Sequence, residues 1–347
     1  MNQQPIRGRG ASGNPANRFE QNQTELEPEE KVLPRTEFLR DFSKSIVTEN
    51  NSPDAGFRFS VNPYRGCEHG CAYCYARPTH EYLGYSAGLD FESKIFVKED
   101  APELLRAKLM SKSWVPETIF MSGITDCYQS IERQRQLTRA CLSVLCEFRN
   151  PVGIITKNEL VTRDIDLLAP MAKLSAAMVY VSVTTLDDEL CSALEPRTSR
   201  PRARLRAIKA LADAGIPVGV NIAPVIPGLT DHEMPMILKA AREAGATMAG
   251  FTPVRLPLTV LPIFTEWLEV HRPQRKEKVL QLIRDMRGGK LNDSNFGTRM
   301  RGEGPVAENL SQMFKIYSRR EGFNSREWEL TTEHFRRRGD QLSFELT

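Results

Sequence analysis

Between residues 57 and 254 the chain alternates short apolar runs with amphipathic segments, and this alternation restricts the fold more than any other feature. The apolar runs are typical of strands and lie at 57–61, 117–123, 151–156, 177–185, 216–228 and 247–254. Helical periodicity falls between the later runs, at 131–148, 163–174, 204–215 and 233–246. Strands joined by helices predict a parallel sheet. Six units are fewer than the eight of a closed barrel, so we expect an α/β fold with a partial (β/α)6 barrel.

The two flanks differ from this region in composition, which predicts three parts. Residues 1–56 are polar and rich in Asn, Gln, Glu and Pro, so we expect a mostly irregular N-terminal extension. Residues 57–258 form the expected core barrel. In 259–347, apolar residues recur at helical spacing, as Val279 and Ile283 do, and we expect a helical C-terminal extension packed on the barrel.

Composition limits the class of protein. Seven cysteines in 347 residues, three of them within eight positions, fit a local site of reduced thiols better than a disulfide scaffold. No apolar run approaches the roughly 18 residues that span a bilayer, and the first residues lack the apolar stretch of a secretory signal. We therefore expect a cytoplasmic protein with no membrane partner.

Charge is unevenly distributed along the chain. The formal net charge is +3, yet residues 271–347 hold 16 Lys+Arg against 11 Asp+Glu, a difference of +5. A basic end favours a polyanionic partner. An ordinary solvated surface explains the same counts.

The segment GCEHGCAYCYAR carries the strongest chemical signal, because it spaces Cys67, Cys71 and Cys74 as Cys-x3-Cys-x2-Cys. Three thiolates from one loop can hold three irons of a cubane cluster and leave the fourth iron open. An open coordination position distinguishes a catalytic metal centre from a structural one. The alternative is a zinc site with His69 or His80 as fourth ligand, in a nucleic-acid-binding module without catalysis.

With an aromatic residue, Tyr73, directly before the third cysteine, this segment resembles the signature of the radical S-adenosylmethionine (SAM) superfamily. The resemblance implies a [4Fe–4S] cluster whose open iron binds the amino and carboxylate groups of SAM. It implies further that one electron, from a donor such as flavodoxin or ferredoxin, cleaves SAM to methionine and a 5′-deoxyadenosyl radical. That radical abstracts a hydrogen atom from the substrate. No second cysteine-rich segment is present in the sequence, so we expect one cluster.

Polar residues follow the ends of successive expected strands, where the active sites of parallel barrels lie. By the resemblance, the end of the second strand, MSGITDCYQ, holds the SAM amino group, although it departs from the commonest Gly-Gly-Glu form. A plain strand-to-helix turn capped by Asp126 fits the same residues. Lys157 would meet the SAM carboxylate or ribose. The predicted SAM contacts are Tyr73, Ser122, Gly123, Thr125, Asp126, Lys157, Ser182, Asn221 and Ala223.

Several segments also resemble a narrower group, the uncharacterised bacterial branch related to spore photoproduct lyase, often labelled DNA repair photolyases. They include NPYRGCEHGCAYCYAR, GITDCYQSIE, LEPRTSRPRARLRAI and APVIPGLTD. The lyase returns a hydrogen atom from a cysteine near the end of its second strand. That position looks like Gly123 here, and Cys127, four residues later, is a candidate hydrogen donor. An inert, half-buried thiol is the alternative for Cys127.

Five arginines lie within ten residues of the segment EPRTSRPRARLR, at positions 197, 200, 202, 204 and 206. Arginine forks match phosphates and carboxylates, so this run and the resemblance to DNA-lesion enzymes favour a nucleic-acid substrate. The competing interpretation pairs Arg197 with Glu195 and gives the run a structural role. Pro201 is expected to start the helix that carries the last of these arginines.

Overall fold

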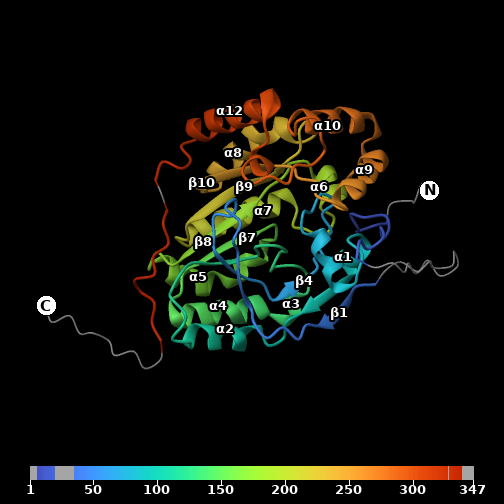
Figure 1. Ribbon diagram of the computed structural model, residues 1–347. Coiled ribbons are helices and arrows are strands. Elements are labelled where there is room, and N and C mark those ends of the chain that lie inside the picture. Colours follow the sequence, from blue (N-terminus) through green and yellow to red (C-terminus); the bar gives the residue numbers. More distant parts are fainter. Residues whose placement is uncertain (1–5, 20–34, 327, 338–347) are drawn as a thin grey trace.

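The computed structural model describes residues 6–19, 35–326 and 328–337. Residues 1–5, 20–34, 327 and 338–347, which belong to the two predicted extensions, lie outside the described residues. A seven-stranded sheet in the order β10-β9-β8-β7-β6-β3-β2 forms the centre (Figure 1). In that order its strands are Met248–Pro253, Val218–Val225, Ala177–Ser182, Val152–Thr156, Ile119–Met121, Phe59–Val61 and Val47–Glu49.

The six strands from β10 to β3 run parallel, and β2 pairs antiparallel with β3 at one edge. In the middle of the sheet Val179 stands opposite Ile154 on one side and Val218 on the other, and all three side chains are buried. Such strands are covered on both faces, which explains why they read as apolar runs. All six predicted strands are present, so the predicted α/β fold with a parallel sheet is confirmed.

Helices connect these strands in the predicted alternation. The predicted apolar stripe of α4 (Leu137–Phe148), with Cys141 and Leu145 in its middle, is buried. Helices α5 and α7 pack beside the strands that they join (Figure 1). The remaining connecting elements are α3 (Glu132–Arg135), η3 (Glu159–Asp164), α5 (Ile165–Ala172), α6 (Asp188–Leu194), α7 (Pro201–Asp213), η4 (Asp231–Glu233) and α8 (Met234–Glu243).

The helix predicted at 131–148 is wrong in one respect, because it is two helices and not one. Gln136 between α3 and α4 has a positive φ of 52°. The buried carboxylate of Glu132 accepts the backbone N–H groups of Thr138 at 2.9 Å and Arg139 at 3.3 Å. A side chain in α3 thus caps α4, which favours a turn over a continuous helix.

A second sheet, which the sequence did not indicate, supports the cysteine segment. It has the order β1-β5-β4, with strands Glu37–Arg40, Lys94–Val97 and Tyr64–Arg65. The 3-10 helix η2 (Arg77–Leu83) and helix α1 (Leu89–Ser93) lie between β4 and β5, and α2 (Ala101–Met110) follows β5. Strands β1 and β2 both lie within the predicted N-terminal extension.

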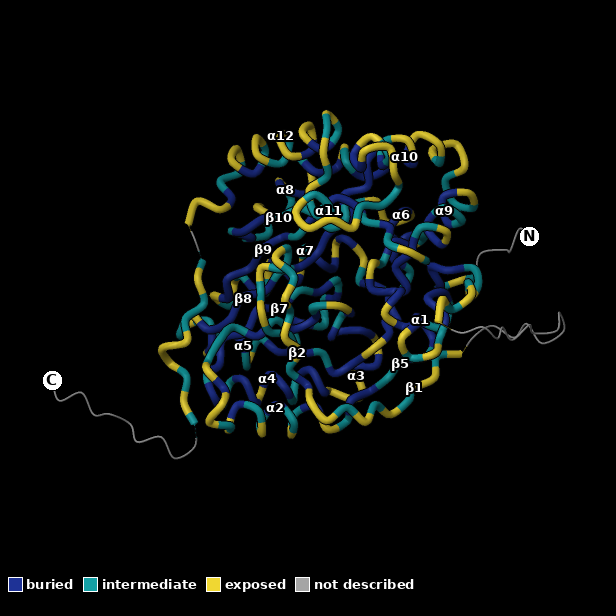
Figure 2. The backbone as a smooth tube through the Cα atoms, in the orientation of Figure 1, coloured by how far each residue is buried: buried dark blue, intermediate teal, exposed yellow. Residues whose placement is uncertain are grey.

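Beyond β10 lies a described segment in which helices predominate. Its helices are α9 (Val260–His271), α10 (Pro273–Asp285), α11 (Thr298–Arg301) and α12 (Gly304–Arg320). Helix α12 packs on α8 and exposes its outer side to solvent (Figure 2). Among the described residues, no helix has both the length and the apolar character needed to span a bilayer.

Candidate active site

The three cysteines lie on one loop between β4 and η2. All are free thiols; Cys67 and Cys71 are buried and Cys74 is half-buried. Cys74 packs against the apolar neighbours of both other cysteines, so the three side chains border a common region. Burial raises the pKa of all three groups, so without a bound cation they are thiols and not thiolates.

Two distant segments hold the cysteine loop in place. Arg77 donates from Nε and Nη2 to the backbone oxygen of Cys71, at 3.0 and 2.9 Å, and pairs with the buried carboxylate of Glu92 at 2.6 Å. The backbone N–H groups of Gly10 and Ala11 donate to the same carboxylate, at 3.1 and 2.9 Å. A Cβ on Gly10 would lie 1.8 Å from a carbonyl oxygen of the cysteine loop, so the N-terminal segment fits there only as glycine.

Neither histidine completes a zinc site with the cysteines. The Nδ1 atom of His69 lies 3.5 Å from the carboxylate of Asp126, and its Nε2 lies 3.4 Å from the amide of Asn158. His80 is packed among aromatic rings, with Phe91 at 5.7 Å between ring centroids. Within the described residues, no three His, Cys, Asp or Glu side chains are grouped to hold a single metal ion. A cubane cluster has a separate iron for each thiolate, so the three cysteines fit a cluster better than one zinc ion.

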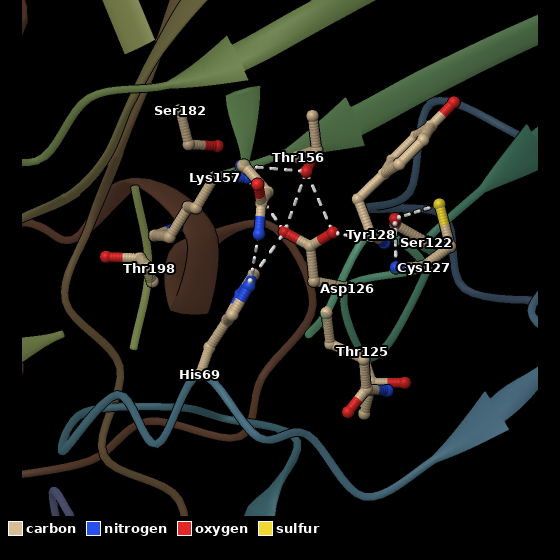
Figure 3. Close-up of polar contacts among 12 residues, drawn as sticks. His69, Ser122, Thr125, Asp126, Cys127, Tyr128, Thr156, Lys157, Ser182 and Thr198 are labelled. Carbon is tan, nitrogen blue, oxygen red and sulfur yellow. Dashed lines mark hydrogen bonds and ion pairs between the residues drawn. The ribbon is translucent and has the colours of Figure 1, made fainter. Parts of the chain in front are cut away.

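Asp126 lies at the centre of the strand-end polar residues (Figure 3). Its carboxylate accepts hydrogen bonds from Thr156 Oγ1 at 2.8 Å, Lys157 N at 2.7 Å and Tyr128 N at 2.9 Å, and lies against His69. Burial lowers the pKa of His69, and the opposing effect of Asp126 is smaller. The protein thus uses the acceptor capacity of Asp126 to join the cysteine loop to the ends of β6 and β7.

A buried charged network lies on the other side of Lys157. Its Nζ donates to the backbone oxygen of Ala223 at 3.1 Å and lies 5.9 Å from the ring centroid of Tyr73. Glu195 accepts short hydrogen bonds from Tyr73 and Arg204. Burial alone would raise the pKa of Glu195, but Arg204 and then Lys157 outweigh it and hold the pKa at about 2. Glu195 is therefore an ionised, fully paired carboxylate beside the cysteine loop.

The other predicted residues after β6 face elsewhere. The Ser122 hydroxyl donates to the thiol of Cys127 at 3.1 Å, and Cys127 is fully buried in the core (Figure 3). Thr125 donates from its hydroxyl to the backbone oxygen of Tyr64 in β4 at 3.2 Å. Gly123 accepts from the hydroxyl of Tyr75 at 3.1 Å. The structure does not bring Thr125 or the thiol of Cys127 to the strand-end network.

Ser182, the last residue of β8, is paired with Asn221, which lies in the middle of β9. Ser182 is buried, and Figure 3 shows its side chain near Lys157. Ala223, two residues after Asn221, contributes its backbone oxygen to Lys157. Of the predicted SAM contacts, the structure therefore gathers Tyr73, Asp126, Lys157, Ser182, Asn221 and Ala223 around one region beside the cysteines.

Comparison with known proteins gives the family. A family model described as the radical SAM superfamily matches residues 61–241, which is 181 of 347 residues. The chain belongs to the radical SAM superfamily. An uncharacterised protein of Mycobacterium bovis is 37% identical over 240 residues, or 68% of this chain and 71% of that one. An uncharacterised protein of Methanocaldococcus jannaschii is 31% identical over 199 residues, or 57% and 71% of the two chains.

Solved structures agree with this family. Spore photoproduct lyase complexed with dinucleoside spore photoproduct has a TM-score of 0.59 at 16% identity, and the match covers 82% of this chain and 80% of that one. At that identity the likeness shows a common fold. The predicted resemblance is confirmed, and the chain is a radical SAM enzyme.

The arginine run of this radical SAM enzyme divides into different environments. Arg204 is fully buried and pairs with Glu195, so the predicted pairing of Arg197 with Glu195 is wrong. Arg197 donates instead to the backbone oxygen of Gly8 at 3.1 Å. Arg200, Arg202 and Arg206 are exposed.

Sequence reasoning missed a group of residues between the first and last strands of the parallel sheet. Tyr75 follows the third cysteine, is 49% exposed, and lies under the guanidinium of Arg255 at 5.7 Å. Arg299 lies over the ring of Phe296 at 4.3 Å and pairs with Asp54 at 2.5 Å. These contacts join the β2–β3 turn and the cysteine loop to the segment after β10. In the sequence, the aromatic residue Tyr75 directly after the third cysteine could have indicated this group.

Proposed function

We propose that Cys67, Cys71 and Cys74 hold one [4Fe–4S] cluster and that the enzyme uses it to cleave SAM reductively. The observation that carries this proposal is the set of three free thiols on one loop with no fourth protein ligand among their described neighbours. When bound, the cluster and SAM would supply a 5′-deoxyadenosyl radical for hydrogen abstraction. The zinc alternative loses support because both ring nitrogens of His69 face other protein groups.

The chain's own residues would bind and orient SAM at the strand ends. Ser182 and Asn221 offer polar side chains there, and Lys157 offers a cation for a carboxylate or a ribose. Asp126 holds His69 and the backbone of Lys157 in place, so we assign it a positioning role beside the predicted direct contact. Ser122, Gly123 and Thr125 would shape the turn after β6. For Cys127, its full burial favours the inert alternative over hydrogen donation.

We further propose that the substrate is part of a nucleic acid. The solved lyase, which shares the fold, carries a dinucleoside photoproduct. In this chain Tyr75, directly after Cys74, and Phe296 are exposed aromatic rings, each with an arginine over it. Aromatic rings stack on nucleobases of any sequence, and an enzyme that acts on a base takes it out of the duplex.

The test combines metal content with turnover. Replacing Cys67, Cys71 or Cys74 by Ala should abolish iron binding and brown colour in anaerobically purified protein, whereas Cys141→Ala should retain both. The parent, reduced with dithionite, should form 5′-deoxyadenosine from SAM, and faster with the DNA or RNA pool that contains its substrate than with peptides. Full iron retention in Cys71→Ala would refute the cluster assignment, and stimulation by peptides alone would refute the nucleic-acid substrate.

A further inference from the structure

A surface cavity of about 510 Å³ opens beside the cysteine loop. Its lining comes from the start of α3, the residues after β7, the start of α6, and the loop before α7 together with the first turns of that helix. The strand-end network described above does not include its basic residues.

Two hydrogen bonds connect the walls of the cavity to the part of the cysteine loop between Cys67 and Cys71. On one wall, the N–H of Ile131, next to the lining residue Ser130, donates to the carboxylate of Glu68 at 2.7 Å. On the other wall, the N–H of Arg197 donates to the backbone oxygen of His69 at 3.3 Å. Glu68 and His69 are both buried. A molecule seated in the cavity would thus be separated from the cysteines by little more than this loop segment.

The charge of the cavity is positive. Five arginines and two acidic residues line it, a net +3 from 5 − 2. Arg133 and Arg202 make no side-chain hydrogen bond or ion pair with the described residues, and both are exposed. Arg206 has only an exposed pair with Glu159, at 3.3 Å, and such pairs contribute little. These guanidinium groups are therefore available to an anionic partner.

We propose that this cavity docks an acidic electron-donor protein, whose flavin or iron–sulfur group passes one electron to the cluster. The inference rests on the proposed function, since reductive cleavage of SAM consumes one electron. The donor loses that electron and the cluster gains it, with no atom or proton transferred. Complexes of this kind form small, weak interfaces steered by opposite charge, which a compact basic cavity suits.

The position of the cavity favours this partner over a nucleic acid. Asn158 and Ser199 form part of its wall, and Ser199 bonds to the Asn158 side chain at 3.2 Å and to the backbone oxygen of Lys157 at 3.3 Å. Behind that wall, the side chain of Lys157 is directed to the backbone oxygen of Ala223 and not into the cavity. A nucleic acid bound by the arginines of the cavity would be separated by this wall from the strand-end residues, and its bases would not reach them.

The test compares a protein donor with a small one. Anaerobic protein with its cluster is mixed with reduced flavodoxin, with reduced ferredoxin, or with dithionite, and cluster bleaching is followed by stopped-flow absorbance. The variant is Arg133→Glu/Arg202→Glu. The matched control is Arg275→Glu/Arg320→Glu, two exposed arginines on α10 and α12 with the same change in charge.

We expect the cavity variant to be reduced by the protein donors about 10-fold or more slowly at low salt, because electrostatic steering raises association rates by roughly that factor. Added salt should narrow the difference, and the rate with dithionite should match the parent. Equal rates for the cavity variant and the control with both protein donors would overturn the proposal. So would loss of binding to a DNA or RNA oligonucleotide in the cavity variant with unchanged reduction. An absence of cluster, or of SAM cleavage with dithionite, would instead refute the proposed function.

Discussion

Arg204→Met tests whether a buried arginine in the run is structural. Arg204 is fully buried, pairs with the carboxylate of Glu195, and donates to the backbone oxygens of Ser199 at 2.7 Å and Ser182 at 3.0 Å. Methionine keeps most of the apolar stem and removes the charge. Removing one partner of a buried ion pair costs about 3–5 kcal/mol, because the remaining charge stays buried without compensation. We expect a loss of that size in the free energy of unfolding.

The pH dependence of this loss follows from Glu195. In the parent its pKa is held at about 2, below its ordinary value, so its contribution to stability is present at pH 7 and is lost only as the pH falls toward 2. Without Arg204, burial is the largest remaining influence on Glu195, so we expect its pKa to rise above the unfolded value. The folded variant then binds a proton more readily than the unfolded chain. Its stability should therefore rise relative to the parent as the pH falls from 7 to 5.

Urea unfolding of the metal-free proteins under anaerobic conditions, followed by circular dichroism, measures both effects. Arg206→Met is the matched control, because Arg206 lies in the same helix, is exposed, and should change stability by less than about 1 kcal/mol. Arg204→Met/Glu195→Gln should recover part of the loss by removing the unpaired carboxylate. If Arg204→Met costs no more than Arg206→Met, or if its deficit does not shrink at pH 5, the reasoning fails.

Asp126→Ala and Lys157→Ala should each keep their iron and form 5′-deoxyadenosine more slowly than the parent, because they alter the strand-end network and not the cysteines. Anaerobic chromatography measures the rate of 5′-deoxyadenosine formation. If both variants form it as fast as the parent, the strand-end assignment is contradicted. Gly10→Ala should displace the N-terminal segment, since its Cβ would lie 1.8 Å from a carbonyl oxygen of the cysteine loop. The cysteines of the metal-free variant should react faster with iodoacetamide than those of Gly56→Ala, whose Cβ would meet nothing within 4 Å; equal rates would mean that the segment does not cover the loop.

Features with a local cause could be predicted from the sequence. Buried parallel strands read as apolar runs, so their number and order followed from the alternation with helices. The cysteine loop was recognisable because all three thiols lie within eight residues. Asp126 was predicted to follow the second strand, and its carboxylate lies against His69 of the cysteine loop and accepts the N–H of Lys157; the ends of neighbouring parallel strands meet at one edge of a sheet.

Features that depend on distant partners could not be predicted in the same way. Glu92 binds the N–H groups of Gly10 and Ala11, more than 80 positions away, and no local pattern indicates this. The same holds for His69, which its position between Cys67 and Cys71 made a candidate zinc ligand and which the fold turns toward Asp126. Cys127 looked close to the site along the chain, yet the turn after β6 directs its thiol into the core.

The arginines of the run fall into different environments for a reason that helical geometry explains. In α7, Arg204 shares one face with Ala207, Ile208 and Leu211, three, four and seven positions later, and that whole face is buried. Arg202 and Arg206 are four positions apart and lie together on the exposed side, where both line the cavity. The phase of one helix therefore separates an arginine that neutralises a buried carboxylate from arginines available to a partner. A count of basic residues along the sequence treats them alike, and only their placement on the helix distinguishes the two roles.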